Sequence, residues 1–160
     1  MENKIDSRYF RGLIALPNLN TQAEYDSPSS DNINSNISEL DLYITEYQEE
    51  FFIKLFGSDV IPTEVEADLI KESIFRSPIA DYVFCQVIHQ YQSQLTESGE
   101  KIHNATESQN VSYQERFFIV WNRMVKDCVK IRETLYTAGL HTTYPTEDNE
   151  DIYNYKSFLL

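Results

Sequence analysis

The stretch SYQERFFIVWNRMVKDCVKIRETLYTA, from Ser112 to Ala138, decides the fold of this chain. Its apolar residues recur at spacings of 4, 3, 4, 3 and 4, which places them along one side of a helix of about seven turns. These residues are Phe117, Trp121, Met124, Cys128, Ile131 and Leu135. Ser112 and Glu115 form a capping-box pattern at the start of the helix. Gly139 suits the left-handed backbone conformation that commonly ends a helix. Such a helix is typical of the core of a helical bundle, and we expect Trp121 to be buried there.

Two stretches before it predict further helices. The first runs from about Ser38 to Phe56, with a capping box at Asn36 and Glu39 and with Gly57 at its end. Its apolar stripe consists of Leu40, Ile44, Tyr47, Phe51 and Leu55. The second is shorter and runs from about Pro62 to Phe75. It is expected to begin at Pro62 because proline suits the first helical position. Its inward residues are expected to be Val65, Leu69 and Ile74.

A third helix begins at Ser77-Pro78, an N-cap followed by proline, and ends near Ser98-Gly99. One row of its apolar residues consists of Ile79, Val83, Val87, Tyr91 and Leu95, and a second row of Ala80, Phe84 and Ile88. Because two rows imply burial on two sides, we expect this to be the central helix that faces Ser112–Ala138.

Residues 1–36 predict an arm followed by a flexible loop. The apolar run from Leu13 to Leu16 lies between Gly12 and Pro17 and suits a strand or an extended segment. Residues 21–36 are polar and rich in turn formers. A mobile terminus and an arm that contacts another subunit both fit this composition. The arm residues expected to bind a partner chain are Tyr9, Phe10, Leu13, Ile14 and Leu16.

Residues 140–160 predict a C-terminal tail. Its first half contains Pro145 and the acidic run EDNED, residues 147–151, which favours an extended, solvated chain. Its last nine residues, IYNYKSFLL, are too apolar to leave in water. We expect them to bind a partner, the alternative being that they fold back on their own bundle. The tail residues expected at that contact are Tyr153, Tyr155, Phe158, Leu159 and Leu160.

The composition limits the functional classes. The formal net charge is −13, with 26 acidic residues against 13 Lys and Arg, so general nucleic-acid binding is not expected. The 11 tyrosines are typical of protein–protein contacts. Cys85 and Cys128 lie on apolar helix stripes, which favours reduced core thiols. The sequence contains no apolar run of membrane-spanning length and no signal peptide.

The sequence offers little that could carry catalysis. Glu100 and His103 have the spacing of one di-iron ligand pair, whereas a bundle site needs two such pairs and two further glutamates. His89 and His141 stand without other ligands, and neither cysteine has a basic neighbour in sequence. A phosphate-binding glycine pattern is also absent. We therefore expect no enzyme, no metal and no cofactor.

Four blocks together resemble the small helical head–tail connector proteins of tailed bacteriophages, most of all those of crAss-like phages of Bacteroidetes. They are YFRGLIALPNL from residue 9, LDLYITEYQEEFFIKLFG from residue 40, SPIADYVFCQVI from residue 77 and WNRMV from residue 121. The resemblance implies a ring, commonly of twelve subunits, beneath the portal at the genome exit. It implies contacts with the portal and with other neck or tail proteins, and passage of DNA without specific binding. The acidic loop near residues 20–36 departs from clearer portal adaptors.

The expected fold is all-α: a four-helix bundle over residues 37–139, with an extended N-terminal arm and a C-terminal tail. The expected function is a structural virion protein of the phage neck, made in the host cytoplasm and found at the head–tail interface. The alternative is an intracellular helical regulator that binds one protein partner as a monomer or dimer. A third hypothesis, a metal-dependent bundle enzyme, would require tightly bound iron or manganese.

Overall fold

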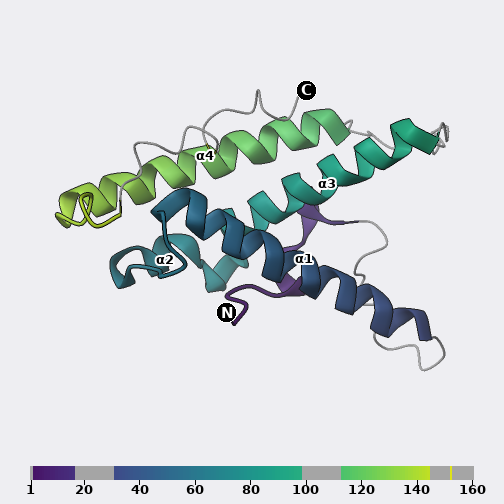
Figure 1. Ribbon diagram of the computed structural model, residues 1–160, viewed down its shortest axis with the longest axis horizontal. Coiled ribbons are helices and arrows are strands. Elements are labelled where there is room, and N and C mark those ends of the chain that lie inside the picture. Colours follow the sequence, from purple (N-terminus) through teal and green to yellow (C-terminus); the bar gives the residue numbers. More distant parts are fainter. Residues whose placement is uncertain (1, 17–30, 99–112, 145–151, 153–160) are drawn as a thin grey trace.

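The computed structural model describes residues 2–16, 31–98, 113–144 and 152, and within them the fold is all-α. Its three long helices are α1 (Asp31–Phe56), α3 (Pro78–Ser98) and α4 (Tyr113–Thr137). α3 packs against both of the others and lies alongside α4, while α1 crosses in front of it (Figure 1). The prediction that the Ser77-Pro78 helix is central and faces the Ser112–Ala138 helix is therefore confirmed.

The ends of α4 and α3 follow the predicted signals. At the end of α4, Gly139 takes a φ of +72°, the Leu140 amide donates to the Leu135 carbonyl at 2.9 Å, and the Gly139 amide donates to the Tyr136 carbonyl at 3.1 Å. This pair of hydrogen bonds is a Schellman motif, for which glycine is preferred because its φ is positive. At the start of α3, the Ile79 amide donates to Ser77 Oγ at 3.1 Å, so Ser77 is the predicted N-cap.

α1 begins seven residues earlier than predicted, at Asp31 rather than near Ser38. The capping box predicted at Asn36 is therefore wrong, because that residue lies inside the helix. Ile33 and Ile37 continue the helical spacing of the Leu40 stripe. The Asn- and Ser-rich composition of residues 31–38 masks this weak apolar signal. At its other end, α1 stops as predicted at Gly57, whose φ is +68°.

The predicted helix from Pro62 to Phe75 is wrong. The chain instead forms three short turns: η3 (Thr63–Val65), α2 (Glu66–Leu69) and η4 (Glu72–Ile74). The Lys71 and Arg76 backbones then hydrogen-bond to each other, and Phe75 adopts left-handed geometry, with φ 47° and ψ 55°. Four helices of comparable length are thus not found in the described chain. We call residues 57–77 the connector.

One hydrophobic core joins all of these elements. Trp121 is 1% exposed, which confirms its predicted place, and the described residues of both α3 rows are buried as well. The side chains of Tyr91 and Leu95, and the Ser112 cap, lie outside the described part. In the connector, Val65 and Leu69 are buried as predicted, but Ile74 is 61% exposed, since η4 turns it outward. In the described residues, no helix is long and apolar enough to cross a lipid bilayer.

Candidate functional site

α4 carries a polar flank beside its core stripe. Arg116, Arg123, Asp127 and Lys130 follow one another at spacings of 7, 4 and 3, so they share one side of the helix. Arg116 contacts the N-terminal residues and Arg123 contacts α3, whereas Asp127 and Lys130 both contact the connector. Lys130 Nζ donates to Asp68 Oδ1 of α2 at 2.6 Å, an exposed pair that contributes little to stability. The other three form partly buried contacts.

Arg123 and Asp81 form the most buried of these contacts, across the interface of α4 and α3. Arg123 Nε donates to Asp81 Oδ2 at 2.8 Å, and Nη2 donates to the other carboxylate oxygen. The Asp81 side chain is fully buried, whereas that of Arg123 is 27% exposed. Burial raises the pKa of Asp81 above its ordinary value, because removing the carboxylate from water outweighs the attraction of Arg123. The pair therefore links α3 and α4 across their interface at an energetic cost of desolvation.

Asp127 attaches the connector to α4. Its carboxylate accepts from Arg76 Nη2 at 3.0 Å and lies 3.4 Å from Lys71 Nζ. These are the two residues whose backbones pair across the turn that contains Phe75. One aspartate on α4 therefore binds both sides of a turn whose last residue, directly before Arg76, is left-handed and is not glycine. Such a conformation is costly for a bulky residue and persists only when its surroundings impose it.

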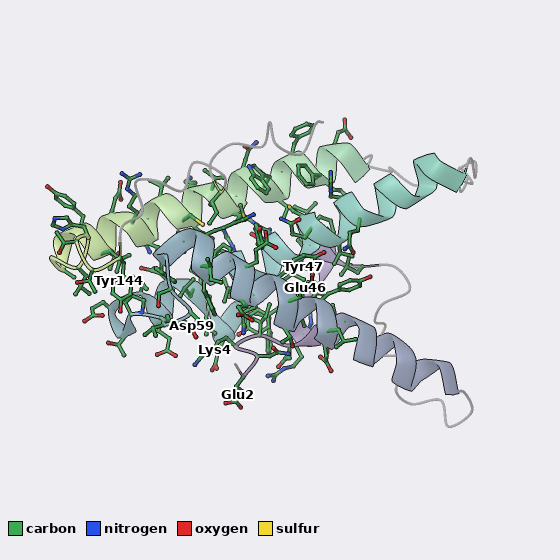
Figure 2. The ribbon with its side chains drawn as sticks, in the orientation of Figure 1. Glu2, Lys4, Glu46, Tyr47, Asp59 and Tyr144 are labelled. Carbon is green, nitrogen blue, oxygen red and sulfur yellow. The ribbon has the colours of Figure 1, made fainter. Side chains whose placement is uncertain are left out.

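The N-terminal segment lies inside the fold, which corrects the prediction of an arm on another chain. Its side chains are buried or packed against the core of the same chain: Tyr9, Phe10, Leu13, Ile14 and Leu16. The segment begins beside α1, where the Lys4 amide donates to Gln48 Oε1 at 2.6 Å, and Figure 2 shows Lys4 next to this helix. It ends at α4, where Arg116 donates to the carbonyls of Leu13 and Ala15 at 2.6 and 2.9 Å.

The segment lies inside because its apolar side chains are buried in the same core and its carbonyls accept hydrogen bonds from Arg116. It also packs against the connector. The Tyr9 ring packs edge-on against Phe75 of the connector at 5.8 Å. Arg8 and Arg11 place their guanidinium carbons 5.1 and 4.8 Å from the centroid of the same ring. The N-terminal segment is thus in contact with the connector as well as with α1 and α4.

The described residues contain no group of three or more His, Cys, Asp or Glu side chains that could hold a metal ion. Glu100 and His103 lie outside the described residues. His141 is exposed, with its ring tilted against that of Tyr136 at a centroid distance of 4.8 Å, and His89 is partly buried on α3. Both cysteines are free and buried, as predicted. Burial raises the pKa of the Cys85 and Cys128 thiols, so both stay protonated and are poor nucleophiles.

α4 also carries a second apolar stripe, one residue beyond the core stripe and on the side opposite to the polar flank. We call it the apolar flank; its members are Phe118, Val125, Val129 and Tyr136. Val125 is partly buried, whereas Val129 is 42% and Tyr136 69% exposed. Asn122 and Arg132 complete the 4, 3, 4, 3, 4 spacing between them. Three of the four, Phe118, Val129 and Tyr136, are exposed large apolar side chains.

The predicted partner residues of the tail, Tyr153, Tyr155, Phe158, Leu159 and Leu160, lie outside the described residues. Two residues of the tail region are placed. Tyr144, beyond the end of α4, packs its ring edge-on against Phe56 at 6.1 Å, and Figure 2 shows it at that end of the helix. Ile152 is fully buried and belongs to the hydrophobic core. The chain therefore returns to its own core at one point within the tail.

Sequence reasoning missed the Asp81–Arg123 pair. One signal was present: Asp81 interrupts a helix face that is otherwise apolar, between Ala80 and Tyr82. A buried carboxylate requires a cationic partner, and α4 is the basic helix of the chain. Which base pairs with it depends on the relative register of two helices, and periodicity does not contain that information.

No family model, no curated protein and no solved structure matches this chain. A functional proposal therefore rests on the residues of the chain itself and on the contacts described above.

Proposed function

We propose that this chain is a structural subunit of a ring in the neck of a tailed bacteriophage, where it joins the portal to tail components. In this proposal the subunit is a helical bundle closed by its N-terminal segment. It forms a homo-oligomer, commonly of twelve copies, and lines the channel through which DNA leaves the head. Its C-terminal tail beyond Ile152, residues 153–160, provides a contact to the portal or to an adjacent ring.

The observation that carries the proposal is that four sequence blocks pack into one core. These are the blocks that resemble phage head–tail proteins. Each block contributes buried side chains to one core, among them Phe10, Phe51, Phe84 and Trp121. Blocks far apart in the sequence are thus parts of one packed unit. If the resemblance reflects a shared fold, the four blocks must pack together, because each block alone is a weak signal.

The charge of the chain supports the same proposal. With a net charge of −13, a ring of many copies would surround the exit channel with negative potential. Such a surface repels phosphates and lets duplex DNA pass without sticking.

Solution mass tests the proposal. The 18.8 kDa chain, purified alone and together with the portal protein encoded by the same genome, is analysed by light scattering and electron microscopy. A closed ring, formed alone or on the portal, is the expected result. A chain that stays monomeric or dimeric in both samples would contradict the proposal and support a helical regulator with one protein partner.

A further inference from the structure

The turn of residues 71–76 in the connector depends on other segments for its shape. All of its side chains are exposed or only partly buried, and residues 72–74 are exposed. Phe75 nevertheless has a left-handed backbone, with φ 47° and ψ 55°. This conformation is unfavourable for a bulky residue. Because the turn buries little surface of its own, contacts from outside must supply the free energy that keeps Phe75 left-handed.

α4 supplies the first of these contacts. The Asp127 carboxylate lies 3.4 Å from Lys71 Nζ and 3.0 Å from Arg76 Nη2. The backbones of the same two residues pair across the turn, with the Lys71 amide donating to the Arg76 carbonyl at 3.0 Å and the Arg76 amide donating to the Lys71 carbonyl at 3.2 Å. The Asp127 side chain is only 14% exposed, so its ion pairs are less screened by water than surface pairs are. Asp127 thus fixes the two ends of the turn.

The N-terminal segment supplies the second contact, to the aromatic ring of the turn. Tyr9 packs edge-on against Phe75, and the guanidinium groups of Arg8 and Arg11 lie within cation–π distance of the same ring. These three side chains can meet the ring together only while the Phe75 backbone presents it to them. The docked N-terminal segment and the left-handed turn therefore favour each other.

α4 also fixes the far end of the N-terminal segment. Arg116 donates to the carbonyls of Leu13 and Ala15 at 2.6 and 2.9 Å. It lies on the same flank of α4 as Asp127, about 16 Å away along the helix. The contacts therefore form a closed circuit that runs from α4 through the N-terminal segment to Phe75, and back through the turn to α4.

We propose that residues 2–16 and 71–76 form a latch, a single unit that opens and closes on α4 cooperatively. In the open state the N-terminal segment leaves the core and Phe75 relaxes from its left-handed conformation, while α1, α3 and α4 stay packed. Such sub-global opening is typical of segments that are attached by few contacts. Because residues 72–74 are exposed, a partner that binds the turn also shifts the docking of the N-terminal segment. The latch operates whether or not the chain assembles into a ring.

Native-state hydrogen exchange of the full-length chain, followed by NMR, tests the latch. The reporters in the turn are the amides of Lys71 and Arg76, and those in the N-terminal segment are the amides of Phe10 and Ala15, all of which donate backbone hydrogen bonds. With added denaturant, the four should converge on one opening free energy and one denaturant slope, both below the values for the α3 and α4 amides. Two different opening free energies for the two segments would overturn the proposal.

A substitution at one end of the circuit should be felt at the other. Asp127→Asn weakens the ion pairs to the turn, so the protection of the turn amides should fall about threefold or more. The protection of the Phe10 and Ala15 amides should fall by the same factor. Asp68→Asn is the matched control, because Asp68 also pairs the connector with α4, through Lys130, but outside the turn. It should leave the N-terminal amides unchanged. A loss confined to the turn, or no loss in the turn, would overturn the latch.

The reverse substitution completes the test. Arg116→Met removes the hydrogen bonds to the N-terminal carbonyls and should lower the protection of the Ala15 amide about tenfold. The amides of Lys71 and Arg76 should lose protection by the same factor, although Arg116 binds the opposite end of the N-terminal segment. Lys126→Met removes an exposed base from the same helix and should change neither set. Full protection of the turn amides in Arg116→Met would show that the two segments open independently and would overturn the proposal.

Discussion

Asp81 of α3 and Arg123 of α4 form a bidentate ion pair in which the carboxylate is fully buried and the guanidinium is partly exposed. The pair lies within the interface that the two helices share, and Arg76 and Asp127 lie close enough to influence the charges of its members. The stability of the fold and its pH dependence both depend on this contact.

Arg123→Ala should destabilise the fold by about 3–5 kcal/mol, because it leaves a buried carboxylate without its partner. Asp81→Ala should cost less, since the guanidinium is partly exposed and can reach water. Denaturant unfolding of the two single variants and the double variant gives the coupling energy. A double variant as unstable as the sum of the two singles would mean that the residues do not interact.

The pH dependence of this pair has a definite sign. The folded-state pKa of Asp81 is raised above its ordinary value of 3.8, mainly by burial. The stability that comes from protonated Asp81 is therefore fully present below 3.8 and is lost as the pH rises through the folded pKa. The unfolding free energy of wild type relative to Asp81→Asn should fall across this range. A difference that rises with pH would mean that Arg123 outweighs burial.

Removing the N-terminal segment should destabilise the subunit. Tyr9 and Phe10 are buried in its core, so Phe10→Ala should cost about 3–5 kcal/mol of unfolding free energy. Arg11→Ala is the matched control in the same segment; its side chain is exposed, and the expected change is below about 1 kcal/mol. Thermal melting of both variants checks this. Unchanged melting of Phe10→Ala would restore the hypothesis of an arm that binds elsewhere.

Trp121 should fluoresce at short wavelength, because its side chain is 1% exposed among apolar neighbours and stacks on Phe117 at 5.8 Å. Trp121→Ala should cost about 3–5 kcal/mol, whereas Trp121→Phe, which keeps a ring in the site, should cost less. Emission typical of water-exposed indole from the folded chain would contradict the packing of α4 on α3.

The two cysteines should resist modification in the native state. Burial raises both thiol pKa values, so the reactive thiolate is scarce and inaccessible. A thiol reagent should modify Cys85 and Cys128 only as fast as the protein opens, and both at once in denaturant. Rapid modification of either residue at neutral pH would show that the core around α3 and α4 is not closed.

The sequence by itself determined the long helices and most of their ends. Apolar spacing placed α3 and α4, and Gly57, Ser77 and Gly139 marked boundaries because their preferences depend on local backbone geometry. It also determined which faces of α3 and α4 are buried, including the place of Trp121. These properties follow from neighbours within about one helical turn, and periodicity reports them directly.

Only the tertiary structure decided how the remaining parts close the core. The connector forms short turns instead of one helix, and Asp127 of α4 binds its Lys71 and Arg76 side chains. The N-terminal segment lies inside the fold, where Arg116 binds its carbonyls. The partner of Asp81 depends on the register between two helices. Each of these outcomes depends on contacts between residues more than 40 positions apart, whose free energies local propensity and spacing do not contain.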